Sequence, residues 1–244
     1  MIISPKKSFI KSNLLYNMAD IHSHILPGLD DGTSTFNEAV ESLRWLKSNG
    51  INRMYLTPHI MTEYFKNSKI YILEQFDIFK MKLRNSGIED IPELKIGAEY
   101  MLEPAFEKHK NEELLSYANR HVLVETSYIT PPVGFISILE KLMEDGYSIV
   151  LAHPERNVYM DMRDYKYLSA EGVLFQLNFL SLTKAYGRHT KEVAIRLLND
   201  GLYKYTGSDF HRLAHHESYY LSKSLTKKQT IALQCLIENN EELW

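Results

Sequence analysis

The sequence predicts one α/β domain that folds as a (β/α) barrel, and three observations support this prediction. The chain has 244 residues, 44% of them hydrophobic, which suffices for one large core. Short apolar runs alternate with longer stretches of helical periodicity, as in the βαβ units of a parallel sheet. Most of the apolar runs end in histidine or carboxylate residues, and barrel enzymes place their functional side chains at the carboxyl ends of the strands.

Seven short runs rich in aliphatic, β-branched or aromatic residues are expected to form the strands. In chain order they cover residues 19–23, 53–60, 94–100, 121–127, 147–157, 172–178 and 203–211. Seven parallel strands fit a closed barrel better than a short open sheet, and a barrel of about 250 residues matches the length of the chain.

Six longer segments with apolar residues three or four positions apart are expected to form helices between these strands. They cover residues 33–50, 69–87, 103–118, 133–146, 189–201 and 226–242. In the first of them, Ala39, Leu43 and Leu46 share one helical face. Gly50 is then expected to end the helix.

The chain contains no repeat, low-complexity tract or linker rich in Pro, Gly and Ser that would divide it. We therefore expect a barrel domain over residues 18–244, preceded by an N-terminal extension over residues 1–17. No run approaches the roughly 18 apolar residues that a membrane-spanning helix needs, and no apolar run of secretory length begins the chain. These features predict a cytoplasmic protein without membrane insertion.

Charge and cysteine content narrow the possible functions. The net charge is −3 and the basic residues are spread along the chain, so no nucleic-acid-binding surface is predicted. The only cysteine, Cys235, cannot form a disulfide within the chain, which fits a reducing compartment. Cys235 lies in an apolar helical run and has no arginine six residues later, so we predict a packed core thiol rather than a phosphatase nucleophile.

Nine side chains near the ends of the predicted strands are candidate metal ligands. They are His22, His24, Asp31, His59, Glu99, Glu125, His153, Asp209 and His211. Positions i and i+2 of a strand point to the same side, so His22 and His24 can bind one ion together. Asp209 and His211 repeat this spacing on the last strand. Since the last strand neighbours the first in a closed barrel, the two pairs are expected to face each other.

Some of these residues allow a second interpretation. Glu99 and Glu125 follow runs too apolar to bury a carboxylate without a compensating cation. His59 is either a ligand or a core histidine with a backbone partner. Of Asp30 and Asp31, one is expected to be an oxygen ligand and the other a residue of a polar turn.

Arg156 follows His153 closely, and an arginine beside a metal site suits recognition of a phosphoryl oxygen. The alternative is a salt bridge to Glu155 or Asp161. Since one ion takes about four to six ligands, nine candidates imply two or three ions, and imidazole with carboxylate ligands favours Mn, Fe or Zn.

Five motifs, in this order, resemble the polymerase-and-histidinol-phosphatase (PHP) superfamily. They are HSHILPGLDDG (22–32), TPH (57–59), GAE (97–99), HPERN (153–157) and GSDFH (207–211). The set is most similar to the bacterial PHP-type protein tyrosine phosphatases of capsule and exopolysaccharide regulation. This resemblance implies a single-domain, distorted (β/α)7 barrel with a trinuclear metal centre, usually assigned to manganese.

The resemblance also implies how the ligands are shared. The first ion would be bound by His22, His24, Glu99 and Asp209, the second by Glu99, Glu125 and His153, and the third by Asp31, His59 and His211. Arg156 matches the arginine that lies beside the phosphate in this family. A second arginine of the family corresponds to His216 in this chain.

The implied function is that of a metal-dependent protein tyrosine phosphatase. A hydroxide shared between two ions would attack phosphorus in line, while the third ion and Arg156 neutralise charge on the phosphoryl oxygens. Arg156, Asp31 and His211 are the expected catalytic residues, and Asp30 or His216 is the candidate acid for the leaving tyrosinate. The usual partner in the family is a bacterial tyrosine kinase with a tyrosine-rich tail.

Two other functions use the same ligands. One is a small-molecule phosphatase, such as a histidinol-phosphate phosphatase, or a phosphodiesterase. The other is a non-catalytic, metal-holding scaffold that binds phosphotyrosine. The loop with Tyr128 and Phe135 on either side of two prolines is expected to be a rigid connection to the next helix or, alternatively, a wall for an aromatic ring.

Overall fold

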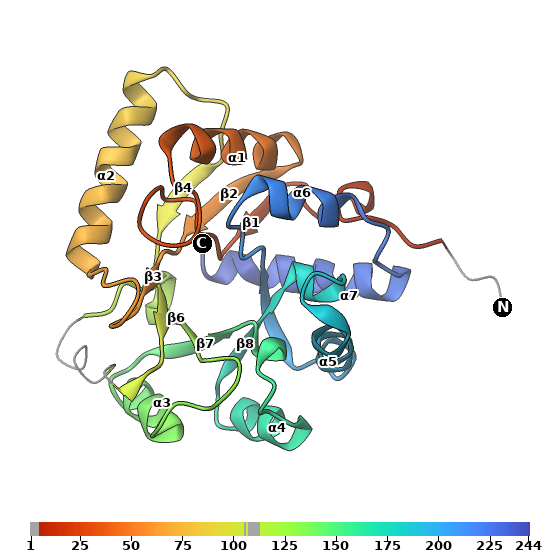
Figure 1. Cartoon of the computed structure of the whole chain (residues 1–244). Helices are drawn as coiled ribbons and strands as arrows, with labels where there is room; N and C mark the ends of the chain where they lie inside the picture. Colours follow the sequence, from red (N-terminus) through yellow and green to blue (C-terminus); the bar gives the residue numbers. More distant parts are fainter. Residues whose placement is uncertain (1–4, 105, 107–112) are drawn as a thin grey trace.

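Parallel strands form the centre of the molecule, and helices surround them (Figure 1). The computed structural model describes residues 5–104, 106 and 113–244. The strands form a three-stranded sheet in the order β1-β2-β4 and a six-stranded sheet in the order β3-β5-β6-β7-β8-β9. Their bounds are β1 (Met18–Asp20), β2 (Ile51–Leu56), β3 (His59–Ile60), β4 (Glu93–Ile96), β5 (Glu99–Met101), β6 (His121–Glu125), β7 (Ser148–Ala152), β8 (Leu174–Asn178) and β9 (Tyr203–Gly207).

These nine strands correspond to the seven predicted strand segments, because two of the segments are each interrupted once. Pro58, which has no N–H to donate, separates β2 from β3, and Gly97 separates β4 from β5. The backbone pairing continues across both interruptions, since Gly97 donates to the Leu56 carbonyl (2.9 Å) and Glu99 donates to the Pro58 carbonyl (3.2 Å).

The ring of strands closes through the residues that follow β1. Ser23 forms a parallel bridge with Phe210, and His24 donates its backbone N–H to the Phe210 carbonyl at 2.8 Å. On the other side, Thr57 donates to the Ser23 carbonyl at 2.7 Å. The first and last strand segments are therefore neighbours, as predicted, and the α/β barrel is confirmed.

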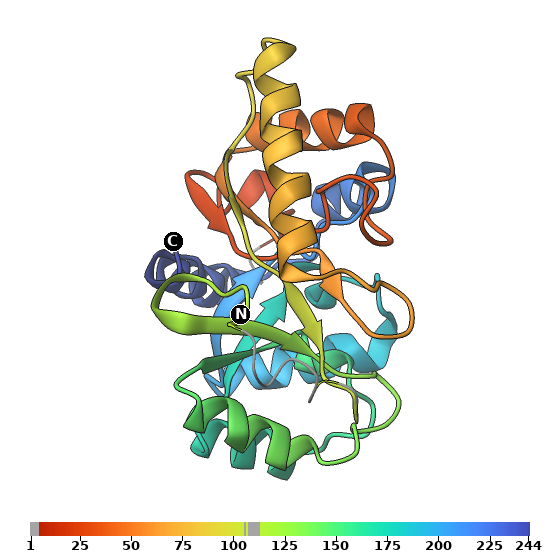
Figure 2. The same ribbon diagram turned by 90° about the vertical axis from the view of Figure 1, so that its left-hand side faces the viewer.

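Seven α-helices are found in the described residues and pack around the strands (Figure 1). They are α1 (Phe36–Ser48), α2 (Lys69–Asn85), α3 (Phe135–Glu144), α4 (Met162–Ala170), α5 (Gly187–Asn199), α6 (Leu213–Leu221) and α7 (Lys227–Asn239). Helix α1 begins with a capping box. The Thr35 hydroxyl accepts from the Glu38 backbone N–H, and the Glu38 carboxylate accepts from the Thr35 backbone N–H. Helix α2 projects beyond the rest of the barrel (Figure 2).

Five of the six predicted helical segments contain a helix. In the sixth, residues 103–118, residues 105 and 107–112 lie outside the described residues, and the described residues 113–117 do not form a helix. Sequence periodicity missed α4 and α6, since each helix buries only two side chains and at most one of them is aliphatic. Helix α6, for example, buries His216 and Tyr220 rather than aliphatic residues.

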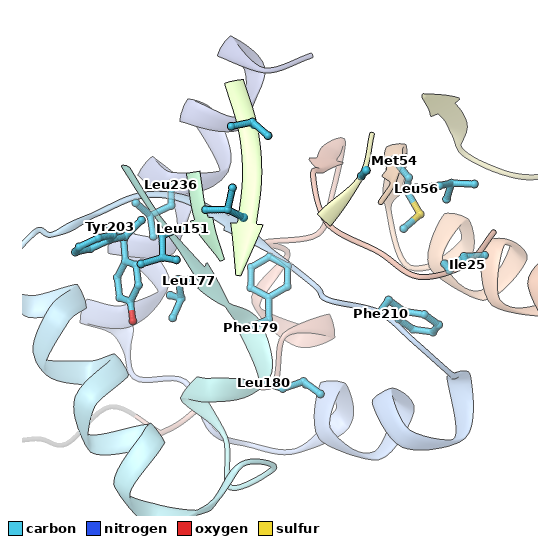
Figure 3. Packing of buried hydrophobic residues seen from close by; sticks show 14 of the residues in the cluster. Ile25, Met54, Leu56, Leu151, Leu177, Phe179, Leu180, Tyr203, Phe210 and Leu236 are labelled. Atoms are coloured by element: carbon cyan, nitrogen blue, oxygen red, sulfur yellow. The ribbon is translucent and has the colours of Figure 1, made fainter. Parts of the chain in front are cut away.

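Side chains alternate between the two sides of the strands, which separates two cores. Val122 and Val124 of β6 point outward into the large cluster beneath the helices, whereas Leu123 belongs to the small interior cluster. Figure 3 shows part of the outer cluster, where Leu151 and Leu177 come from neighbouring strands. The barrel interior is therefore filled by packed side chains, and the polar side chains lie above them at the carboxyl ends of the strands.

The described part of the N-terminal segment packs against the barrel. The Phe9 ring is fully buried, with centroids 5.3 Å from Phe179 and 5.5 Å from Tyr220. Lys7 pairs antiparallel with Leu225. The division of the chain at residue 18 stays a prediction.

Two further features concern the helices. Among the described residues, no helix has both the length and the hydropathy needed to cross a bilayer. The prediction that Cys235 is a packed core thiol is wrong, because the side chain is exposed. Helix α7 turns Gln229, Leu233 and Leu236 toward the barrel, and Cys235, two positions after Leu233, lies on the opposite face.

Candidate metal centre

All nine predicted ligands lie together at the carboxyl ends of the strands. His22 and His24 follow β1, His59 and Glu99 begin β3 and β5, Glu125 ends β6, His153 follows β7, Asp209 and His211 follow β9, and Asp31 lies in the loop after β1. Seven of them are almost fully buried, while Asp31 is exposed and His211 is half-buried. This burial places Asp31 and His211 at the mouth of the site.

Ligand atoms converge in four overlapping groups, each with all of its atoms within 4.8 Å of one another. The groups are His24, Asp31, His59 and His211; His22, His24 and Asp209; His22, Glu99 and His153; and His59, Glu99 and Glu125. The first group contains the implied set of Asp31, His59 and His211 with His24 added, and the second contains the implied set of His22, His24, Glu99 and Asp209 without Glu99. The remaining two divide the expected third set between them, with Glu99 in common.

Glu99 is the central carboxylate of the site. Its Oε2 atom lies 3.2 Å from His22 Nε2, 3.3 Å from His24 Nε2 and 3.1 Å from His59 Nδ1. Its Oε1 atom lies 3.0 Å from His153 Nε2. A carboxylate surrounded by four imidazoles in this way is suited to bridge two cations.

The hydrogen bonding of the site fits bound cations. Glu99 Oε2, Glu125 Oε1, His59 Nδ1 and His153 Nδ1 are buried atoms without a hydrogen-bond partner. His59 Nδ1 lies 3.1 Å from Glu99 Oε2 and 3.0 Å from Glu125 Oε1 without forming a hydrogen bond to either carboxylate. Since orphaned buried polar atoms cost about 1–3 kcal/mol each, cations that contact these atoms would offset that cost. The nitrogen and oxygen donors suit divalent first-row metals.

The charges of the cluster are complementary. Burial raises the pKa of Glu99, but the positive His22 and His59 rings hold this pKa well below its usual range. Burial and the charge of His59 lower the pKa of His24, whereas Asp30 and Asp209 hold it well above its usual range. Protonated imidazoles thus balance the carboxylates, and a metal ion that binds here displaces those protons.

Asp30 and Asp31 have different surroundings. Asp30 Oδ2 lies 2.8 Å from His24 Nδ1 and accepts the His59 backbone N–H at 3.1 Å, while its Oδ1 accepts from Gly32. Asp31 Oδ1 instead lies 3.3 Å from His211 Nε2 and 3.5 Å from His59 Nε2. The geometry therefore favours Asp31 as a ligand and gives Asp30 the role of orienting His24.

Sequence reasoning missed the amide side chains at the end of β8. Gln176 Oε1 lies 3.0 Å from His22 Nδ1, and Asn178 donates to Asp209 Oδ2 at 2.8 Å. Partners of this kind fix the ring orientation and tautomer of a ligand. The signal was present in the sequence, because β8 is the one predicted strand that ends in amides instead of a histidine or a carboxylate.

Arg156 reaches the site, and the salt bridges considered as its alternative are wrong. Its Nη1 atom lies 3.0 Å from Asp209 Oδ2. Glu155 instead accepts hydrogen bonds from the Asn178 backbone and the Tyr203 hydroxyl, and Asp161 pairs with Arg163.

His216 does not face the site. Its ring stacks on Phe210 with centroids 4.4 Å apart, and its two nitrogens lie 3.1 Å from the backbone oxygens of Arg212 and Asp209. Burial lowers its pKa to about 4. These contacts leave no ring nitrogen for a phosphate or for the leaving group.

A groove of about 640 Å³ opens beside the candidate ligands. Asp31, His59 and Glu125 form one end of it, and residues 126–133 form a wall. Tyr128 belongs to this wall, whereas Phe135 begins α3 and does not line the groove; that the wall receives an aromatic ring stays a prediction.

The comparison with known families gives the same assignment as the motifs. Residues 18–241 match the family described as capsular polysaccharide synthesis, CpsB/CapC. The chain belongs to this family.

Named relatives and a solved structure add detail to the CpsB/CapC assignment. The chain is 30% identical over 207 residues to the tyrosine-protein phosphatase YwqE of Bacillus subtilis, with 80% of this chain and 78% of YwqE covered. It is 27% identical to the putative tyrosine-protein phosphatase CapC of Staphylococcus aureus, with 81% of this chain and 78% of CapC covered. A chain from the crystal structures of B. subtilis YwqE and Streptococcus pneumoniae CpsB, described as unique metal-dependent tyrosine phosphatases, superimposes with a TM-score of 0.74 at 26% identity, covering 91% of this chain and 95% of the other.

Proposed function

We propose that this protein is a metal-dependent protein tyrosine phosphatase of the CpsB/CapC family. The observation that carries the proposal is the convergence of nine imidazole and carboxylate side chains, with Arg156 beside Asp209, next to a groove that Asp31, His59 and Glu125 line. The named relatives are tyrosine-protein phosphatases, which supports the same reaction class. The reaction is hydrolysis of a phosphotyrosine ester to tyrosine and inorganic phosphate.

The ligands that we assign form three ion sites, for which manganese is the proposed metal. His24, Asp31, His59 and His211 would hold the outermost ion, and His22, His24 and Asp209 a second. Glu99 would bridge to a third ion with Glu125 and His153. Bound divalent cations supply activation of water and neutralisation of phosphoryl charge.

The remaining steps belong to the protein side chains. Arg156 donates N–H groups to the phosphoryl oxygens and balances the charge that develops there. Asp31 and His211, at the mouth, would hold the outermost ion where the phosphate arrives, and the Asp31 carboxylate can accept a hydrogen bond from the attacking water. Buried Glu99 and Asp209 hold the histidines in place, so the site needs little reorganisation during the reaction.

The groove supports a protein substrate over a small metabolite. Ile129 and Val133 on its wall are 74% and 79% exposed, and Tyr64 is 84% exposed. Exposed apolar side chains next to a catalytic centre suit the chain on either side of a phosphotyrosine. We therefore propose a tyrosine-phosphorylated protein in the cytoplasm as the substrate, in particular the tail of a bacterial tyrosine kinase.

The test compares a phosphotyrosine peptide, histidinol phosphate and a phosphodiester as substrates, with manganese or with a chelator. His22→Ala is the variant of the site, and His189→Ala is the matched control, because His189 is an exposed histidine on α5. We expect manganese-dependent hydrolysis of the peptide that is lost only in His22→Ala. Preference for histidinol phosphate would move the protein to metabolite hydrolysis, and metal binding without turnover would indicate a scaffold.

A further inference from the structure

Arg156 is held by aromatic side chains that neither the motifs nor the relatives identify. The arginine lies in the turn after β7, Tyr128 in the loop after β6, and Tyr186 at the start of α5 after β8. The guanidinium carbon is 4.2 Å from the centre of the Tyr128 ring and 4.3 Å from the centre of the Tyr186 ring. The two rings come from the loops on either side of the Arg156 turn, because β7 lies between β6 and β8 in the sheet, and the guanidinium lies over both of them.

The contacts at the edge of the guanidinium complete this arrangement. Arg156 Nη1 lies 3.0 Å from Asp209 Oδ2, and the same oxygen accepts from Asn178 Nδ2 at 2.8 Å. Asn178 Nδ2 also donates to the Tyr186 hydroxyl at 3.2 Å. Tyr186 is therefore tied to the candidate ligand Asp209 through Asn178. On the other side, the Tyr128 ring makes an edge contact with His153, with centroids 5.8 Å apart.

A guanidinium with rings against its faces can form hydrogen bonds only in its own plane. Arginine has five N–H donors in that plane, and Asp209 uses one direction. The Arg156 side chain is only 19% exposed, so few rotamers are open to it. Such a guanidinium is preorganised for two parallel hydrogen bonds to a phosphoryl group, and a lysine ammonium could not use the same support.

We propose that Tyr128 and Tyr186 are positioning residues that clamp the Arg156 guanidinium and thereby set the affinity of the site for a phosphoryl group. The proposal rests on the proposed function, because it assigns the phosphate contact to Arg156. It predicts that the ring faces carry most of the effect and that the hydroxyls, including the Tyr186 hydroxyl that accepts from Asn178, contribute little.

The experiment measures binding and turnover in paired variants. Tyr128→Leu and Tyr186→Leu remove a ring, whereas Tyr128→Phe and Tyr186→Phe keep it. Binding of inorganic phosphate to the manganese-loaded protein is measured by calorimetry, and kcat and KM are measured with a phosphotyrosine peptide. Metal content and melting temperature are determined for every variant.

We expect each leucine variant to raise the phosphate Kd and the KM by about 3- to 30-fold, the range of a partly buried cation–π contact. The value of kcat should fall less than KM rises, and each phenylalanine variant should restore wild-type values within about twofold. Arg156→Lys should match the leucine variants although it keeps the charge. If one leucine variant does not fold, the other decides the question.

Tyr147→Leu is the matched control. Tyr147 stacks on Arg120 with 4.1 Å from the guanidinium carbon to the ring centre, at the opposite end of β7 from the site. This variant removes a comparable contact, so it should lower the melting temperature and leave the phosphate Kd unchanged.

Two results would overturn the clamp. One is a wild-type phosphate Kd in both leucine variants, and the other is an equal loss in the phenylalanine variants, which would assign the effect to the hydroxyls. If the wild-type protein does not hydrolyse the peptide, the proposed function fails, but phosphate binding still decides whether the clamp exists.

Discussion

Replacement of Glu99 by glutamine tests whether the buried cluster is a metal centre. Glutamine keeps the size of the side chain but removes the charge that lies within 3.3 Å of His22, His24, His59 and His153. Glu99 belongs to two of the four ligand groups and lies beside a third. Its loss should therefore weaken metal binding throughout the site, with little change in packing.

The expected size of the effect follows from linkage. A metal at 100 times its Kd stabilises the folded protein by about 2.7 kcal/mol. For a chain of this length, each kcal/mol shifts the melting temperature by about 2–4 °C, so manganese should raise it by about 5–11 °C in the wild type. Since orienting groups outside the ligand shell already contribute about 10- to 100-fold to affinity, we take 100-fold for a direct ligand. At the same manganese concentration the variant then gains about 0.4 kcal/mol, or about 1 °C.

The assay is differential scanning fluorimetry of each protein with manganese and with a chelator. Comparing the two conditions within one protein removes any effect of the substitution on the metal-free fold. Glu140→Gln is the matched control, because Glu140 is an exposed glutamate on α3. An undiminished manganese shift in Glu99→Gln would refute the central role of Glu99, and the absence of a shift in the wild type would refute the metal centre itself.

Three further predictions concern residues near the site and the free thiol. Gln176→Leu removes the partner of His22 Nδ1, so manganese affinity, measured by competition with a chelating dye, should fall about 10- to 100-fold; an unchanged affinity would contradict the orienting role. Gly32→Ala would place a Cβ 1.7 Å from the His24 carbonyl oxygen, so the backbone must move and the unfolding free energy should fall by about 3 kcal/mol in chemical denaturation. Gly97→Ala, whose nearest contact is a side-chain atom at 3.2 Å, should cost less, and the reverse order would show that the loop before α1 is pliable. Cys235→Ser should leave phosphatase activity unchanged, while the wild-type thiol should react with a thiol reagent without unfolding; loss of activity in Cys235→Ser would reopen the cysteine mechanism.

Much of the site was predictable because its information is local. A strand places every second side chain on one side, so the spacing of His22 and His24 already implied a shared ligand position. Glu99 and Glu125 end apolar runs, and the cost of burying a carboxylate is enough to indicate a cation beside them. The helices with regular apolar spacing were found for the same reason, whereas α4 and α6 escaped because their buried faces include polar and aromatic side chains.

The tertiary structure corrected details that depend on residues far apart in the chain. Both Asp30 and Asp31 were possible ligands in the sequence. The structure distinguishes them, because Asp30 accepts the His59 backbone N–H and Asp31 does not. His216 matched an arginine position of the family, but the Phe210 ring and two backbone oxygens hold it away from the site. Cys235 was predicted to be buried because it lies in an apolar run, but only some of the residues in that run are on the face of α7 that packs on β9.

By itself, the sequence determined the barrel, the closure of its last strand against its first and the residue types at the strand ends, since periodicity and burial cost act over a few residues. Only the tertiary structure decided which donors share a group, that Gln176 and Asn178 support His22 and Asp209, and that two tyrosines enclose Arg156. Those contacts join residues far apart in the chain: 154 positions separate His22 from Gln176, and 31 separate Asn178 from Asp209. They depend on the closure of the ring of strands, which brings the loops after β6, β7 and β8 to the same end of the molecule as the first and last strands.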